Sequence, residues 1–225
     1  MTNHKHQMTN NTKASKTNNT QNNLKFVILI LFVFCNLFLV ISSAEAWRIT
    51  PELQKELSEK QAAVRANPKS PDARFDLAIT MAYTNNIQDG WTNLKKVVEL
   101  DPDYRKKGLT DYINKVNASP SDWRLRFRLA FAYYFNDKKK EAIEQLDNVL
   151  IIDPYNVWAY GYIALIYGEM GETDTALVYT RKGLKIDSNV AALHLLLAEG
   201  YNRKGDKWGS IREMMETIRL KALGY

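Results

Sequence analysis

Apolar residues recur at every third or fourth position between residues 123 and 152, the spacing that places side chains on one face of an α-helix. The recurring positions are Leu129, Ala130 and Tyr133 in a first set and Ala142, Ile143, Leu146, Val149 and Leu150 in a second. The polar stretch Asn136-Asp137-Lys138 separates the two sets. The pattern therefore predicts two helices joined by a short turn.

The same pattern returns 34 residues further along the chain. Identical residues occupy matching positions in four pairs, which are Ala130 and Ala164, Tyr133 and Tyr167, Ala142 and Ala176, and Leu150 and Leu184. The second turn is Gly171-Glu172-Thr173, and Gly171 can adopt the left-handed conformation that ends a helix. One helical hairpin is therefore predicted to occur at least twice.

Small residues lie where the paired helices must cross. Ala130 and Ala142 have side chains short enough for two helix axes to approach closely. Pro154, after the second helix, cannot continue that helix but can open the next one. These residues resemble the tetratricopeptide repeat, a helix-turn-helix of about 34 residues with small residues at two fixed positions and a proline near its end. The resemblance implies an all-α fold, a right-handed α-solenoid of antiparallel helix pairs.

Four copies of the unit fit the sequence, at about residues 71–102, 123–154, 157–188 and 191–222. The first copy lies 52 residues before the second, so 18 residues are inserted, within which Gly108 to Val116 could form a short helix. A further helix, about Pro51 to Arg65, would cover the apolar end of the stack. Residues 47–225 are thus expected to form one tetratricopeptide-like domain. An ordinary helical bundle with accidental similarity is the alternative.

The amino-terminal part differs in composition from the repeats. Residues 1–25 are rich in Asn and Thr and contain no acidic residue, which predicts a disordered leader. The segment 26–46 begins with an apolar run and ends with the small residues Ala44 and Ala46. It is expected to be a signal peptide cleaved before Trp47, or alternatively an uncleaved membrane anchor. Positive charge ahead of the segment keeps the leader inside, so both alternatives place the repeats outside the cytoplasm.

The net charge of the chain does not indicate a particular class of binding partner. The chain carries 31 basic and 25 acidic residues, a formal net charge of +6. Without residues 1–46, 27 basic and 24 acidic residues remain, and the net charge falls to +3. We expect no nucleic-acid partner, because basic and base-reading side chains are not regularly spaced along one face. A helical-repeat nucleic-acid binder is kept as an alternative function.

No residue pattern typical of an active site or a metal site occurs in the sequence. His4 and His6 lie in the leader, and His194 has no second His or Cys at metal-ligand spacing. Phosphate-binding glycine loops, nucleophile elbows and metalloprotease motifs do not occur. We expect no catalysis, no metal and no small-molecule cofactor. An enzyme with an unrecognised carboxylate site is the alternative.

The resemblance implies a binding surface, because in this family the first helices of successive repeats line a concave groove. The most prominent candidates for this groove are Phe75, Tyr83, Arg124, Phe127, Phe131, Tyr134 and Trp158. The matching positions further along are Gly161, Leu165, Gly168, Glu169, Ala192, Leu195, Glu199, Asn202 and Arg203. Aromatic anchors suit a peptide or protein partner. The expected function is a non-catalytic protein–protein interaction scaffold.

A second interpretation of the same rings is that they belong to the core. The insertion before Trp123, or the helix from Pro51 to Arg65, could fold over the aromatic stripe. Rings at helical spacing are more often buried than exposed. The sequence leaves both interpretations open.

Signal cleavage can be tested on native protein after cell fractionation. We expect a mature chain that begins at Trp47 in the soluble exported fraction, as read by intact mass and amino-terminal sequencing. An intact leader recovered in the membrane fraction would establish the anchor instead.

Overall fold

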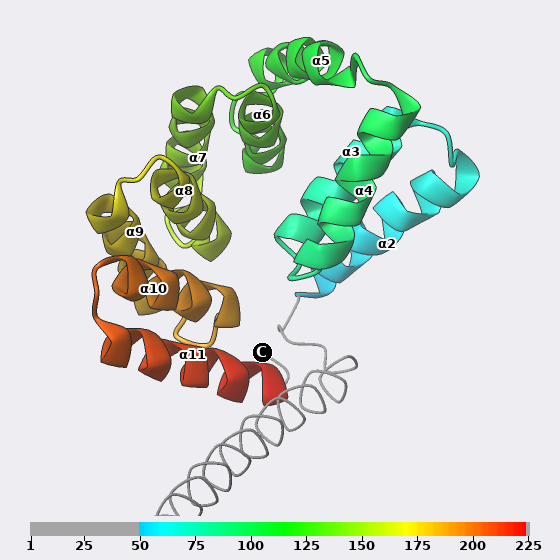
Figure 1. The fold of residues 1–225 in the computed structure, drawn as a ribbon. Coiled ribbons are helices and arrows are strands. Elements are labelled where there is room, and N and C mark those ends of the chain that lie inside the picture. Colours follow the sequence, from blue (N-terminus) through cyan, green and yellow to red (C-terminus); the bar gives the residue numbers. More distant parts are fainter. Residues whose placement is uncertain (1–49, 224–225) are drawn as a thin grey trace, which may run out of the picture. The chain divides into compact units, whose positions relative to one another are not determined.

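Every regular element in the part of the computed structural model that is described, residues 50–223, is an α-helix (Figure 1). In chain order the helices are α2 Pro51–Ala66, α3 Pro71–Ala82, α4 Ile87–Leu100, α5 Tyr104–Ala118, α6 Trp123–Phe135, α7 Lys139–Ile152, α8 Val157–Glu169, α9 Thr173–Ile186, α10 Ala191–Arg203 and α11 Lys207–Ala222. The all-α prediction is confirmed.

Polar caps and prolines determine where several helices begin. Ser70 accepts a hydrogen bond from the Ala73 N–H at the start of α3, at 3.1 Å. Pro71 occupies the first helical position, where a missing N–H costs little. Side-chain caps also begin α2, α6, α8 and α11, at Thr50, Asp122, Asn156 and Asp206. The local sequence therefore fixes these helix starts.

One turn geometry joins the two helices of each hairpin. A residue with positive φ ends the first helix in every repeat, at Asn85, Asp137, Gly171 and Gly205. The next residue donates its N–H to a carbonyl five residues earlier, as from Glu172 to Tyr167 at 2.9 Å. This is the Schellman arrangement, which tolerates Gly best and Asn or Asp next. The left-handed conformation predicted for Gly171 is confirmed.

The helices pack as sequential antiparallel pairs, α3 with α4, α6 with α7, α8 with α9 and α10 with α11 (Figure 1). Each of the four predicted repeats contains one pair. The small residues at the helix crossings are almost fully buried, namely Ala78, Ala130, Ala164 and Ala198. A methyl group at this position lets the helix axes approach closely, so the packing follows from the repeated alanine.

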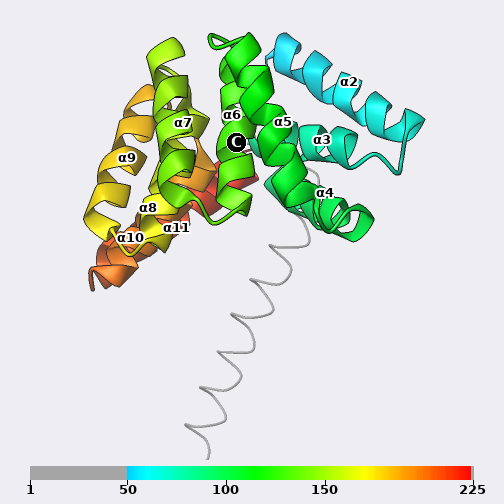
Figure 2. The same cartoon turned by 90° about the horizontal axis from the view of Figure 1, so that it is seen from above.

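The insertion forms α5, which begins at Tyr104 and not at Gly108. Gly108 lies inside this helix, and the Tyr104 ring packs over it so closely that a Cβ at position 108 would come within 2.9 Å of the ring. Phe75 of α3 contacts Tyr104 and Tyr112, with ring centroids 5.6 and 5.2 Å apart. α5 packs along α6 and also contacts α4 (Figure 2). The insertion thus adds a layer between the first hairpin and the second.

The predicted leader, residues 1–25, and the predicted signal or anchor, residues 26–46, lie outside the described residues. Among the helices of residues 50–223, none combines the length and the apolar character that crossing a membrane requires. Cleavage and membrane anchoring therefore stay predictions.

The alanine at the helix crossing gives a test of the packing. Ala164→Leu should lower the free energy of unfolding by about 1–3 kcal/mol, because extra methylene groups overpack a closed crossing. Ala63→Leu, at an exposed position of α2, is the matched control and should change stability by less than about 0.5 kcal/mol. Urea unfolding followed by circular dichroism measures both. Equal effects of the two substitutions would show that Ala164 is not at a tight crossing.

Candidate functional site

Most of the predicted groove residues are part of the core. Phe75, Tyr83, Phe127, Phe131 and Trp158 each expose at most 8% of their surface. The expectation that these five side chains form an open aromatic groove is therefore wrong. Arg124 and Tyr134, by contrast, keep part of their surface accessible.

The rings are buried because they fill the space between the helices themselves. Phe127 of α6 lies edge-on to Tyr83 of α3 and stacks on Phe131, with ring centroids 5.3 and 5.6 Å apart. Tyr162 of α8 covers Phe131 at 4.9 Å. Its hydroxyl donates to the Ala82 carbonyl at 3.0 Å, which ties the third hairpin to the first. Large rings gain more from packing on one another than from exposure to water.

Helix α2 is held against α3 and α6 by a buried ionic network. Arg128 of α6 is 3% exposed and donates to Glu56 of α2 and to Asp76 of α3, each at 3.0 Å. Arg124 donates to the second oxygen of Glu56 at 2.7 Å, and Lys60 donates to Asp76 at 2.8 Å. A buried guanidinium is tolerated only when it is paired in this way, so removing either carboxylate would leave an uncompensated charge.

Neutral groups complete the network. The hydroxyl of Tyr83 donates to Glu56, and that of Tyr112 donates to Asp76. Thr80 accepts from Arg128 at 3.0 Å. Each carboxylate is therefore surrounded by several donors.

These donors govern the acidity of the two carboxyl groups. Burial by itself would raise the pKa of Glu56, but hydrogen bonds from Tyr83, Arg124 and Arg128 outweigh it and hold the pKa below its ordinary value of 4.5. Burial would likewise raise the pKa of Asp76, but the charge of Arg128 and the bond from Lys60 hold it below 3.8. Both groups are ionised near neutral pH.

A wide cleft lies above this network, between α2, α5 and α6. Its volume is about 1140 Å³, including space open to solvent. Five basic residues line it, Lys55, Lys60, Lys115, Arg124 and Arg128, and five acidic ones, Glu52, Glu56, Glu59, Asp76 and Asp122. Because the charges balance and several are paired with each other, the cleft has no evident preference for an anion or a cation.

An accessible groove remains further along the chain, across α4, α6, α8 and α10. Its first part is an apolar cleft of about 290 Å³, including space open to solvent, whose lining includes Trp91, Phe131, Tyr134, Tyr162 and Leu165. Its second part, of about 400 Å³ including space open to solvent, is lined among others by Leu165, Gly168, Glu169, Leu196, Glu199 and Arg203. Leu165 lines both parts, so they form one continuous surface.

Polar contacts hold the side chains of this surface in place. The hydroxyl of Tyr134 donates to Glu169 at 2.7 Å, and Lys139 pairs with the same carboxylate at 3.2 Å. Arg203 donates to the Gly168 carbonyl at 2.6 Å and to Glu199 at 2.7 Å. The groove thus offers an apolar end beside Trp91 and a mixed-charge end beside Arg203.

Of the groove positions that the family resemblance implied for the last two repeats, Trp158 and Gly161 are buried and most of the others are accessible. Glu169, Leu195, Glu199 and Arg203 are exposed, and Leu165 is half-buried. Of the more prominent candidates, only Tyr134 lines this groove while keeping part of its surface accessible, and Arg124 lies in the charged cleft.

Sequence reasoning missed residues in both places. Arg128 lies four residues after Arg124, a spacing that indicates two cations on one helix face and so could have pointed to the network. Trp91 and Tyr162 lie outside the implied groove positions, and no pattern in the sequence distinguished them from core residues.

Several solved structures have a fold similar to that of this chain. TTC0263, a thermophilic TPR protein from Thermus thermophilus, is 18% identical with a TM-score of 0.51, over 73% of this chain and 80% of that one. The chain has the fold of a tetratricopeptide-repeat protein. YrrB, described as a TPR protein with an unusual peptide-binding site, is 15% identical over 72% of this chain and 91% of that one, with a TM-score of 0.47. MamA from Desulfovibrio magneticus RS-1 is 17% identical over 77% and 88%, with a TM-score of 0.43.

The comparisons by sequence give no further assignment. No protein-family model matches the chain, and no curated protein matches it significantly. The likeness to tetratricopeptide-repeat structures therefore concerns the fold.

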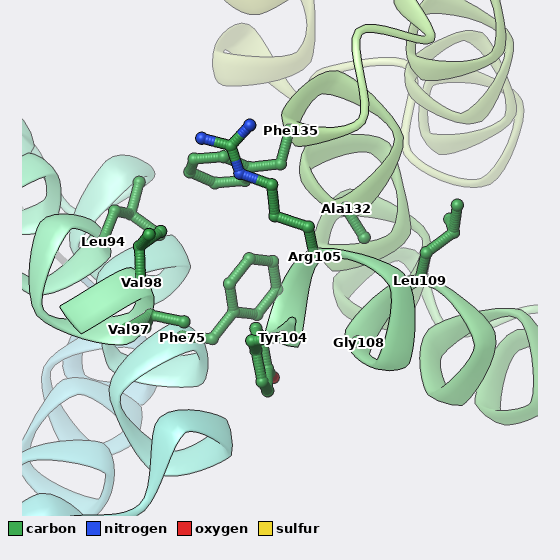
Figure 3. Close-up of a pocket in the computed structure, with 10 residues that line it drawn as sticks. All are labelled: Phe75, Leu94, Val97, Val98, Tyr104, Arg105, Gly108, Leu109, Ala132 and Phe135. Atoms are coloured by element: carbon green, nitrogen blue, oxygen red, sulfur yellow. The ribbon is translucent and has the colours of Figure 1, made fainter. Parts of the chain in front are cut away.

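A separate apolar pocket of about 320 Å³, including space open to solvent, lies where α5 is inserted into the tetratricopeptide stack (Figure 3). Figure 3 shows Leu94, Val97 and Val98 of α4 on one side of it and Ala132 of α6 on the other, with the Arg105 side chain extending toward Phe135. Its lining is otherwise apolar, and most of these side chains belong to the core. The pocket is a packing defect beside the insertion.

No arrangement for metal binding is found in residues 50–223, where no three His, Cys, Asp or Glu side chains converge. His194 instead bonds Glu213 at 2.8 Å and the Ser188 carbonyl at 3.0 Å, so it ties α10 to α11 and to the turn before α10. Its partners give it a structural role.

The ionic network predicts how stability depends on pH. Carboxyl groups whose pKa is lowered by folding stabilise the protein above their unfolded pKa, and this contribution is lost as pH falls through the folded pKa. The free energy of unfolding should therefore be insensitive to Glu56 and Asp76 above about pH 5 and should fall steeply below about pH 4.

Arg128→Met tests the origin of this dependence. It should cost about 3–5 kcal/mol at pH 7, because it leaves two buried carboxylates without their shared cation. Its stability should also begin to fall at a higher pH than that of the wild type, because the pKa values are no longer held down. Arg212→Met, at a largely exposed arginine, should cost less than about 1 kcal/mol. If the free energy of unfolding fell over the same pH range in the wild type and in Arg128→Met, Arg128 would not be the origin of the pH dependence.

Proposed function

We propose that this tetratricopeptide-repeat chain is a non-catalytic scaffold that binds a peptide or protein partner in the groove across α4, α6, α8 and α10. The supporting observation is the continuity of that groove, in which Leu165 joins an apolar cleft to a mixed-charge one. Concave surfaces with a few polar groups among apolar side chains are the usual form of binding sites.

The two ends of the groove select different parts of a ligand. Trp91, Tyr134 and Leu165 offer a surface for one apolar anchor, which would displace water from the rings. Arg203 and Glu199 offer a donor and an acceptor to polar groups of the following residues. An extended peptide or a short helix with one apolar anchor fits this arrangement better than a small rigid molecule.

The alternatives receive less support from the groove. Nucleic acid requires cations that follow the phosphate backbone, whereas Glu169 and Glu199 lie beside Arg203 in this groove. An enzyme would need a carboxylate that is free to transfer a proton. The carboxylate of Glu169 instead accepts a hydrogen bond from Tyr134 and pairs with Lys139, and these contacts hold it in place.

The location we propose is outside the cytoplasm, either exported or tethered to the membrane. This rests on the apolar segment at residues 26–46 and the small residues that follow its apolar run. A partner is then to be sought among proteins of the cell envelope or the surrounding medium.

Peptide selection with matched variants tests the groove. Peptides selected on the full chain from a random displayed library should bind Trp91→Ala and Arg203→Ala at least about tenfold more weakly, a loss of about 1.4 kcal/mol each. Trp208→Ala and Arg212→Ala remove the same side-chain types from an exposed helix outside the groove and should not change affinity. Fluorescence anisotropy gives the affinities, and circular dichroism checks folding.

Two results would contradict the proposal. In the first, selected peptides lose affinity for the Trp208 and Arg212 variants and bind the Trp91 and Arg203 variants normally, which would move the site to α11. In the second, all four variants bind with equal affinity, which would place the site elsewhere.

A further inference from the structure

Helix α11 presents a row of large apolar side chains to solvent. Trp208 is 81% exposed, Met215 65%, and Ile211 and Met214 48% each. Trp208, Ile211 and Met215 follow one another at intervals of three and four residues, so they lie on one face of the helix. A contiguous apolar stripe of this kind usually marks a contact site.

The stripe lies on the side of α11 that faces away from α10. Gly209, Ser210, Thr217 and Leu220 are the buried residues of α11, and Thr217 bonds the Ala191 carbonyl of α10 at 3.4 Å. At about 100° per residue, these buried positions point roughly opposite to Trp208 and Met215. Trp208 and Met215 therefore lie away from the packing of the last hairpin, whereas Ile211 and Met214 bury about half of their surface.

Basic side chains border the stripe on both sides. At about 100° per residue, Arg212 and Arg219 lie along one edge and Lys221 lies along the other, while Lys207 stands at the amino-terminal end of the stripe. Arg212 pairs with Glu213 and Arg219 with Glu216, on the side toward α10. Within residues 50–223, no acidic side chain pairs with Lys207 or Lys221. The exposed face is thus apolar in the middle and cationic at its edges.

We propose that this face of α11, the stripe of Trp208, Ile211, Met214 and Met215 with its basic border, docks onto an anionic lipid surface. Helices that lie in the plane of a membrane have this distribution, with apolar residues between basic ones. Tryptophan is favoured at the boundary between headgroups and acyl chains. Lysine and arginine stems can extend past the apolar row and place their charges among anionic headgroups.

The charge distribution distinguishes this occupant from a second copy of the chain. If two α11 helices packed stripe to stripe, the basic border of each would meet the basic border of the other. Like charges brought together in this way oppose association. An anionic surface meets the same borders with opposite charge, so the observed residues favour lipid.

A dye placed in the stripe tests the proposal on the full chain. Met215→Cys, made together with Cys35→Ser and labelled with the environment-sensitive dye NBD, should brighten and shift to the blue with vesicles of phosphatidylcholine and phosphatidylglycerol at 3:1. Vesicles of phosphatidylcholine alone should give little change. The same dye at Ile151→Cys, an exposed position of α7, is the control and should not respond. Because the readout is local, binding by other parts of the chain does not imitate it.

Charge removal tests the border. Lys207→Ala with Lys221→Ala should raise the vesicle concentration needed for half of the dye response by at least about tenfold, since each basic residue contributes roughly fivefold to the affinity. Lys69→Ala with Lys95→Ala removes the same charge from exposed positions elsewhere and should have no effect.

Three outcomes would overturn the proposal. One is a dye at residue 215 that responds to neither vesicle, and another is an equal response to both compositions. The third is a response of the dye when unlabelled protein is added in the absence of vesicles. This result would assign the stripe to association between copies of the chain. None of these outcomes bears on the peptide groove, whose variants are tested separately.

Discussion

The pairing of one buried guanidinium determines how the first part of this protein is assembled. Arg128 has little contact with solvent, and its charge is compensated by Glu56 from α2 and Asp76 from α3. Since neither carboxylate belongs to α6, the charge is satisfied only when all three helices are in place. A hydrogen bond to a charged group contributes little to the free energy of folding where water competes for it. Removing one partner of a buried ion pair, by contrast, destabilises the folded state strongly. The network therefore fixes the position of α2 more strictly than its small apolar contact through Leu57 would.

The position of α2 and the packing of the rings decide where a ligand can bind. Phe127 and Phe131 fill the space between the first hairpins, and Tyr162 closes over them from α8. The surface that the family resemblance implies is therefore occupied by the protein's own side chains in its first half. From Tyr134 onward smaller residues such as Leu165 and Gly168 line the inner helices, and the groove opens. Side-chain volume thus separates the core from the proposed binding surface along the inner helices.

The two surfaces that we propose for binding differ in their chemistry. The groove combines an apolar cleft with charges of both signs, which suits a peptide that supplies its own polar groups. The outer face of α11 combines an apolar row with charges of one sign, which suits an extended anionic surface. Because the first is built between hairpins and the second on a single helix, both could be occupied at once.

The sequence by itself determined the features that depend on neighbouring residues. The alanines at the helix crossings, the cap at Ser70 and the left-handed turn at Gly171 follow from local patterns, and these specified the helices and their pairing. Tertiary structure decided the exposure of each groove residue, because Phe127 is covered by Tyr83 and Tyr162 from neighbouring hairpins, whereas Leu165 lies beside open clefts. The reach of Tyr162 to Ala82 and the pairing of Arg128 with Glu56 join residues 80 and 72 positions apart. Contacts over such separations depend on how successive hairpins are turned relative to each other, which no local pattern encodes.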